Sequence, residues 1–238
     1  MKNMNSFYIS VDMGDLIYSL LFCKLLNVDT LYVDGHNDDI KLNEENVKFL
    51  LPFMQDQSYM NNVELYNNQS FDLDYGIHPQ QEPVVVGTNL TSYHASKFDI
   101  LNHECIWEPW LDAPILKNDI VKDKKVLINR TARYHGDHRF YTDFLKYFHP
   151  HTILFAGLEE EYEQFCYFFR DQIEFKKVDF LKTETCMELA AAINSIPTFV
   201  GNESLICAIA TGLGKNCYIE YGRAAANYIF NRQNMVYF

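Results

Sequence analysis

The sequence predicts an α/β protein with parallel sheets, arranged as two lobes. Short apolar segments alternate with segments whose apolar residues recur at helical spacing, most regularly after residue 124. Such alternation favours parallel sheets with helices on both faces. The 238 residues suffice for one large domain or two small ones. An irregular stretch with two prolines, 107–123, predicts a linker between a first lobe at 1–110 and a second lobe at 111–238.

The first half contains short strand patterns and amphipathic helix patterns. Apolar residues at helical spacing after a Gly-Asp turn predict the first helix. Asn43 is expected to cap a second helix that carries acidic residues in its first turn. We expect strands at 6–11, 30–33, 63–66 and 83–86, and helices at 16–26, 43–54 and 93–102.

The second half alternates more strictly between strand and helix patterns, which favours a parallel sheet with helices on both faces. We expect strands at 125–128, 152–155, 173–176, 198–200 and 216–219. We expect helices at 140–148, 159–170, 183–194 and 203–211, and the start of one at 224–230. Each half therefore reads as a small Rossmann-like lobe.

Composition excludes several classes of protein. Hydrophobic residues make up 48% and charged residues 22% of the chain, which is typical of a folded protein. No apolar run is long enough to span a membrane, and the first residues lack the apolar core of a secretion signal. The six cysteines are scattered without a CxxC pair, so we expect reduced thiols and a cytoplasmic protein. The residue usage is typical of A/T-rich genes, from a low-GC bacterium or a virus.

Charge is distributed unevenly between the halves. Residues 1–110 hold 16 acidic and 5 basic residues, whereas residues 111–238 hold 16 acidic and 15 basic residues, including all six arginines. The acidic first half disfavours non-specific contact with nucleic acids or anionic membranes. The second half could hold a phosphate, although a solvated surface is the alternative for most of these charges.

Three strand-to-helix turns are candidate sites, because ligands of open α/β sheets bind at the carboxyl ends of strands. The first turn contains Gly14, expected to permit a tight turn, and Asp15 at a helix N-terminus. The alternative is a turn glycine followed by a helix cap. In the second turn, Arg130 and Arg133 flank Thr131, a pattern suited to a diphosphate. The alternative there is a surface loop with ordinary cations.

The third turn runs from Gly201 through Asn202 and Glu203 to Ser204. A glycine followed by a serine at a helix start leaves backbone N–H groups available to an anion. The alternative is a plain capped helix, since the segment matches neither a P-loop nor a GxGxxG pattern.

Other patterns favour neither a metal nor a nucleophile. The pairs His135/His138 and His149/His151 lack further ligands at metal-binding spacing. The triplet 72–74 (Asp-Leu-Asp) lies in an irregular region. We therefore expect no metal site.

Two further features accompany the candidate turns. The acidic run beginning at Glu159 suits the start of a helix, and one of its members could contact a ribose hydroxyl. Trp107 and Trp110 are expected to pack between the lobes rather than stack on a base.

Several segments together resemble heptosyltransferase-like glycosyltransferases. The opening 13–20 (Met-Gly-Asp-Leu-Ile-Tyr-Ser-Leu) resembles that family's Gly-Asp turn and first helix. The stretch 155–162 resembles its strand, Gly157 turn and acidic helix start. The segment 199–204 (Phe-Val-Gly-Asn-Glu-Ser) with 209–215 (Ile-Ala-Thr-Gly-Leu-Gly-Lys) resembles its most distinctive part. The similarity covers nearly the whole second half and residues 6–26, and it points to a short member of the family, from a phage if the gene is viral.

The resemblance implies a GT-B fold, with two Rossmann-like lobes facing across a cleft, and transfer of a sugar from a nucleotide sugar without a catalytic metal or other cofactor. Asp15, preceded by Gly14 on the acceptor side, matches the general base. Donor-binding residues by position are Arg130, Thr131, Arg133, Gly157, Glu159, Gly201, Asn202, Glu203 and Ser204.

The resemblance leaves the acceptor open: a glycan, a small molecule or, for a viral enzyme, a hydroxymethylated base in phage DNA. Two other functions also remain open. One is a non-catalytic nucleotide-binding module on a degenerate GT-B scaffold, and the other is a nucleotide-sugar epimerase.

Overall fold

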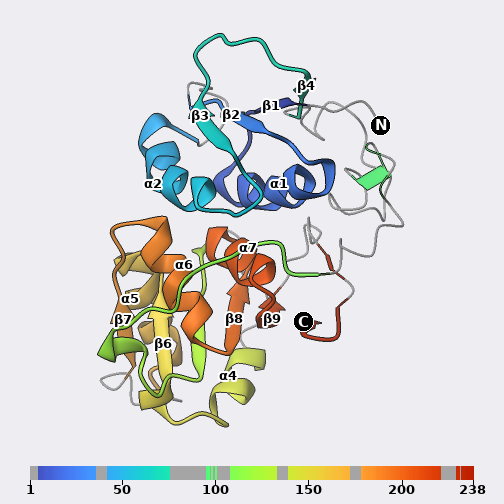
Figure 1. Ribbon diagram of the computed structural model, residues 1–238. Helices are drawn as coiled ribbons and strands as arrows, with labels where there is room; N and C mark the ends of the chain where they lie inside the picture. The colour runs from blue at the N-terminus through green and yellow to red at the C-terminus, as the bar shows by residue number, and fades with distance from the viewer. Residues whose placement is uncertain are drawn as a thin grey trace. The chain divides into compact units, whose positions relative to one another are not determined.

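The computed structural model describes residues 5–35, 42–75, 95–96, 98, 100, 108–132, 139–171, 178–220, 229–230 and 232–238. The chain forms two compact units, each built on one parallel sheet (Figure 1). The first unit comprises residues 1–112, 185–187 and 227–231, and the second comprises residues 113–184, 188–226 and 232–238. The main boundary between them falls within the irregular stretch 107–123.

The first unit contains a four-stranded sheet in the order β3-β2-β1-β4. The strands are β1 (Ser6–Ile9), β2 (Thr30–Val33), β3 (Asn62–Leu65) and β4 (Leu73–Asp74). Side chains alternate between the two faces of a strand, and those of one face are fully buried: Phe7, Ile9, Leu31, Val33 and Val63. Helices α1 (Met13–Leu26) and α2 (Glu44–Gln55) lie on the same side of this sheet (Figure 1).

The two helices of this unit begin differently. Asn43 caps α2 as predicted, because its side chain accepts a hydrogen bond from the Asn46 amide at 2.8 Å. Helix α1 begins at Met13, earlier than predicted, with Asp12 at the cap position. Gly14 therefore lies inside the helix, and the described glycines with positive φ are Gly157 and Gly214. The expectation of a tight turn at Gly14 was wrong, since the helix needs no special backbone conformation there.

The second unit contains a six-stranded sheet in the order β10-β9-β8-β5-β6-β7. The strands are β5 (Val126–Asn129), β6 (Ile153–Ala156), β7 (Asp179–Leu181), β8 (Thr198–Asn202), β9 (Asn216–Glu220) and β10 (Met235–Tyr237). All neighbouring pairs are parallel. Numbered within the unit, this is the 3-2-1-4-5-6 strand order of a dinucleotide-binding fold.

Four α-helices are described in this part of the chain: α4 (Arg139–Leu145), α5 (Glu159–Phe169), α6 (Cys186–Ser195) and α7 (Leu205–Gly212). Two short 3-10 turns, Asp119–Val121 and Pro150–Thr152, precede β5 and β6. The core of the second unit combines strand residues, such as Val126, Ile128 and Phe155, with aromatic helix residues, such as Phe165 and Phe169. No helix among the described residues combines the length and apolar character needed to cross a bilayer.

Three strands of the second unit end on polar residues, later than the apolar pattern predicted. β5 ends at Asn129, β8 at Asn202 and β9 at Glu220. The short strands β4, β7 and β10 were not predicted. The strands expected at 83–86 and 173–176 lie outside the described residues, as do most of the helices expected at 93–102 and 224–230.

Candidate active site

The second unit has its topological switch point between β5 and β8. The chain leaves β5 toward β6 on one side and leaves β8 toward β9 on the other. The register pairs Asn129 with Gly201 where the two strands end. A side chain at Gly201 would collide with the Asn129 carbonyl oxygen and the Phe199 ring, so only glycine fits. Ligands of open α/β sheets bind just beyond such a point.

Asn129 joins three strand-end segments. Its side-chain oxygen accepts the Ser204 hydroxyl at 2.8 Å, and its nitrogen donates to the Ala156 carbonyl at 3.0 Å and to Glu161 at 3.3 Å. The residue is buried, with 1% of its surface exposed. Because a buried amide costs free energy unless its polar atoms are bonded, this network fixes the ends of β5 and β6 against the start of α7.

Asn202 performs a similar task between β8 and the segment after β5. Its side-chain oxygen accepts the Thr131 amide at 2.9 Å, and its nitrogen donates to the Thr131 carbonyl at 2.8 Å. Asn202 is fully buried. The structure therefore brings Thr131, Asn202 and Ser204 together through two buried asparagines.

Ser204 is the N-cap of α7, as the sequence predicted for a serine at a helix start. Its oxygen accepts the Cys207 amide at 3.2 Å. The amides of Leu205 and Ile206 follow it and have no partner within the helix, as in any first helical turn. These amides and the helix dipole make this end of α7 suitable for an anion. Glu203 lies between β8 and the cap and is partly exposed.

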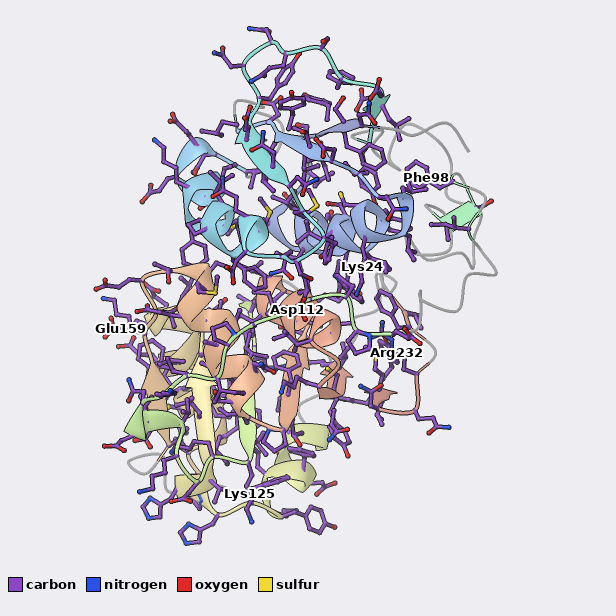
Figure 2. The ribbon with its side chains drawn as sticks, in the orientation of Figure 1. Lys24, Phe98, Asp112, Lys125, Glu159 and Arg232 are labelled. Atoms are coloured by element: carbon purple, nitrogen blue, oxygen red, sulfur yellow. The ribbon has the colours of Figure 1, made fainter. Side chains whose placement is uncertain are left out.

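Gly157 and Glu161 shape the turn after β6. Gly157 has a φ of 149°, and a Cβ there would lie 2.6 Å from both Asn129 Nδ2 and Glu161 Oε2. Glu161 accepts the Leu158 amide at 3.1 Å. Burial raises the pKa of the Glu161 carboxyl, while the bonds from Leu158 and Asn129 act in the opposite direction. Glu159, the first residue of α5, is exposed (Figure 2).

Arg130 differs from the exposed cation that the sequence suggested. Its Nε and Nη2 donate to the two carboxylate oxygens of Glu220, each at 2.9 Å. The two side chains are 2% and 1% exposed. A guanidinium so buried and paired is engaged within the unit. Arg133 lies outside the described residues, so the expected joint contact of the two arginines with a diphosphate stays a prediction.

Asp15 lies at the carboxyl edge of the first unit's sheet. It occupies the first turn of α1, which follows β1, and its side chain is partly exposed. Tyr75 follows β4, the neighbour of β1. Burial raises the pKa of Tyr75, and the charges of Cys23 and Asp15 raise it further. Asp15 and Tyr75 therefore both follow neighbouring strands at the carboxyl end of this sheet, at its own switch point.

The residues weighed as metal ligands have other roles where they are described. Asp72 accepts the amides of Asn5 and Ser6 at 2.9 and 3.1 Å, which ties the start of β1 to the segment before β4. The His149 and His151 rings stack at 4.9 Å. Across the described ranges, no three His, Cys, Asp or Glu side chains form a group that could hold a metal ion. His135 and His138 lie outside these ranges.

Trp110 packs within the first unit. It is 1% exposed, lies against Tyr18 and Phe230, and donates to the Ile17 carbonyl at 3.3 Å. Trp107 lies outside the described residues.

Sequence reasoning missed the roles of Asn129, Glu161 and Glu220. A signal for two of them was present, because Asn129 and Glu220 each directly follow a run of apolar strand residues. A polar residue at the end of a buried strand must find a partner. The identity of that partner depends on strand order, which single-strand patterns do not contain.

Comparisons with known proteins agree with this architecture. No family model matches the sequence, and no curated protein matches it. Among solved structures, the chain is similar to a glycosyl transferase family 9 protein from Veillonella parvula, with a TM-score of 0.64 and 11% identity. That match covers 100% of this chain and 88% of the other.

The chain is also similar to the E. coli heptosyltransferase WaaC. The structure with ADP-2-deoxy-2-fluoro heptose has a TM-score of 0.60 and 11% identity, and the match covers 98% of this chain and 92% of the other. The structure with ADP has a TM-score of 0.56 and 12% identity. At such low identity the likeness concerns the fold, and it confirms the predicted class: an α/β chain with two parallel sheets, as in GT-B glycosyltransferases.

Proposed function

We propose that this protein is a glycosyltransferase that moves a sugar from a nucleotide-sugar donor to an acceptor hydroxyl. The observation that carries the proposal is the switch point of the second unit, where Asn129 and Asn202 lock three strand-end segments around the start of α7. A rigid helix N-terminus at such a point suits a diphosphate. The fold is one that nucleotide-sugar enzymes use.

The donor diphosphate would bind the amides of Leu205 and Ile206. Departure of a sugar leaves negative charge on the diphosphate, and amides fixed in advance stabilise it without reorganisation. Thr131 is bonded to Asn202, which lies two residues before the Ser204 cap, and Arg133 remains a candidate cation on sequence grounds. Glu159, exposed at the start of α5, is our candidate for the ribose hydroxyls.

Asp15 would act as the general base on the acceptor hydroxyl. A carboxylate in the first turn of a helix is stabilised in its ionised form, as a base requires. The balance of 16 acidic and 5 basic residues in 1–110 favours a glycan or small-molecule acceptor over DNA. We propose no metal and no further cofactor for this transfer.

A thermal-shift panel of nucleoside diphosphates and their sugar conjugates tests donor binding. A ligand at a hundred times its Kd should stabilise the protein by about 2.7 kcal/mol. ADP and ADP-sugars come first, because the solved WaaC structures contain ADP and an ADP-heptose analogue. Radiolabelled sugar transfer to candidate glycans, small molecules and hydroxymethylated DNA then tests the acceptor.

A backbone variant tests the helix start itself. Leu205→Pro removes one amide at the first helical position, where proline is tolerated. The preceding Ser204 is extended, with φ −162° and ψ 172°, as proline requires of its neighbour. We expect diphosphate affinity to fall about tenfold through loss of one charge-assisted bond. Glu44→Pro, at the same position of α2, is the matched control and should keep normal affinity.

The outcomes separate the candidate functions. Binding that Leu205→Pro weakens, together with sugar transfer, supports the proposal. Binding without transfer to any acceptor supports the non-catalytic module. Inversion of one stereocentre in the sugar of the nucleotide sugar, without any acceptor, supports the epimerase. Absence of binding by every nucleotide in the panel contradicts all three. Glu159→Ala should weaken nucleotide binding more than Glu160→Ala, a change at a neighbour that is also exposed.

A further inference from the structure

The ion pair between Arg130 and Glu220 is the most deeply buried charge pair in the described part of the chain. Both guanidinium–carboxylate bonds measure 2.9 Å, and the arrangement is bidentate. The guanidinium also lies over the Tyr141 ring, 5.1 Å from its centre, and Tyr141 is fully buried in α4. With 2% of the side chain exposed, this guanidinium presents almost no surface to a ligand.

The pair connects strands that are not neighbours. β8 lies between β5 and β9, and Asn202 is paired with Glu220 in the β8–β9 register. Arg130, directly after β5, therefore reaches past β8 to bond the end of β9. The next residue, Thr131, bonds Asn202 at the end of β8. Two consecutive residues thus fasten the segment after β5 to the ends of two different strands.

The electrostatics give Arg130 a second task. Glu220 is a buried carboxylate at the same sheet edge as the proposed diphosphate site. Without a partner, its charge would be costly and would repel a diphosphate. The bidentate guanidinium neutralises it. The same pair holds the segment after β5 against the end of β8. Asn202 connects that strand end to the residues just before α7.

We infer that Arg130 is a positioning residue, which holds the diphosphate site in place through Glu220 and Thr131 and does not itself bind the diphosphate. This inference rests on the proposed function, since it concerns the same site. The backbone amides at the start of α7 then make the direct contact with the anion.

Three variants separate positioning from direct contact: Arg130→Met, Glu220→Met and the double variant. Each single change leaves one buried charge without its partner and should weaken binding of the tightest diphosphate in the panel about tenfold or more. The double change leaves no unpaired charge, the two methionines can pack against Tyr141, and the untouched Thr131–Asn202 bonds still hold the segment after β5. Positioning therefore predicts that the double variant recovers affinity to within about threefold of wild type, a non-additive cycle.

Direct contact predicts a different pattern. A phosphate-binding arginine lost in Arg130→Met stays lost in the double variant, while Glu220→Met frees it and leaves affinity equal or higher. Calorimetry well below each variant's melting temperature provides the affinities, and circular dichroism checks the fold. Should a single variant not fold, the double variant alone decides: affinity near wild type supports positioning, and an affinity at least tenfold lower overturns it.

Arg130→Lys adds a second readout. Lysine keeps the charge and binds phosphate well, but it cannot form the bidentate pair. Positioning predicts weaker binding, and near-normal binding would overturn it. Wild-type protein that binds no diphosphate would overturn the proposed function and this inference together, whereas normal wild-type binding with an unrecovered double variant overturns the inference alone.

Discussion

The Ser204 hydroxyl donates a hydrogen bond to the side-chain oxygen of Asn129 at 2.8 Å, and it accepts a hydrogen bond from the Cys207 amide at 3.2 Å. One hydroxyl thereby caps α7 and fastens it to the end of β5. Because its hydrogen bond goes to Asn129, this hydroxyl holds the start of α7 in place. The backbone amides that follow it are the groups suited to meet a ligand.

Ser204→Ala should lower the free energy of unfolding by about 1–2 kcal/mol, since it removes a cap and leaves the buried Asn129 oxygen without this bond. Ser204→Thr retains the hydroxyl and should lose less. Urea unfolding of the three proteins measures the difference. An alanine variant as stable as wild type would show that neither bond matters.

Asp15→Asn should lower sugar transfer about 10²–10⁴-fold, because an amide cannot accept the proton. Stability should change by less than about 1 kcal/mol, the usual contribution of a carboxylate in the first helical turn. Donor affinity, measured by calorimetry, should be unchanged. Asp12→Asn is the matched control, as Asp12 lies one position before the same helix and forms no side-chain cap bond. Near-normal transfer by Asp15→Asn would place the base elsewhere.

The stability of the second unit should depend on the protonation of Glu161. Burial raises the pKa of this carboxyl in the folded state, so the folded protein binds the proton more tightly than the unfolded chain. The contribution to stability is complete below the ordinary glutamate pKa and declines as pH rises through the folded pKa. Urea unfolding between pH 4 and about 7 should show a decline that is weaker in Glu161→Gln. Identical pH profiles would contradict this assignment.

Gly157→Ala should destabilise the protein by about 1–3 kcal/mol, because the backbone conformation there is open almost only to glycine. The added Cβ would also lie 2.6 Å from Asn129 Nδ2 and Glu161 Oε2. Gly14→Ala provides the contrast. Gly14 lies inside α1, so alanine should be neutral or stabilising by up to about 1 kcal/mol. Thermal unfolding compares the two, and equal effects would contradict the description of the turn at Gly157.

Sugar transfer should persist in EDTA. The Asp72 carboxylate, one of two in the 72–74 triplet, accepts the amides of Asn5 and Ser6, so Asp72→Asn should reduce stability and leave transfer unchanged. Assays with EDTA, and with Mn²⁺ or Mg²⁺ added back, measure the dependence. Loss of transfer on chelation and its recovery with metal would refute a metal-independent mechanism and return Asp72 and Asp74 to consideration.

Local patterns predicted those parts of the fold that depend on neighbouring residues. Asn43 caps α2 because a cap is decided within four residues, and β2 occupies the predicted residues because its apolar alternation is complete. β4 and β10, with two and three residues, are too short to repeat the two-residue alternation that would reveal a strand.

The candidate site divides in the same way. The place of Ser204 at a helix start could be predicted from its position directly before an apolar helix. The partner of Arg130 lies 90 residues away in the chain and is brought near by the order of strands in the sheet. Arg130 and Arg133, three residues apart, suggested a phosphate-binding site. Nothing in the residues near Arg130 indicated that the buried Glu220 carboxylate would bind it.

The strand order of the six-stranded sheet has a consequence for folding during synthesis. Its first strand in the chain, β5, lies at its centre, and β10, its last, forms an edge beside β9. β5 pairs with β8, which begins only at Thr198, so one edge of β5 stays open until β8 has left the ribosome. Parallel pairing over such separations is slow and exposes nascent chains to aggregation. The polypeptide therefore passes through an interval in which chaperone protection of β5 would matter most.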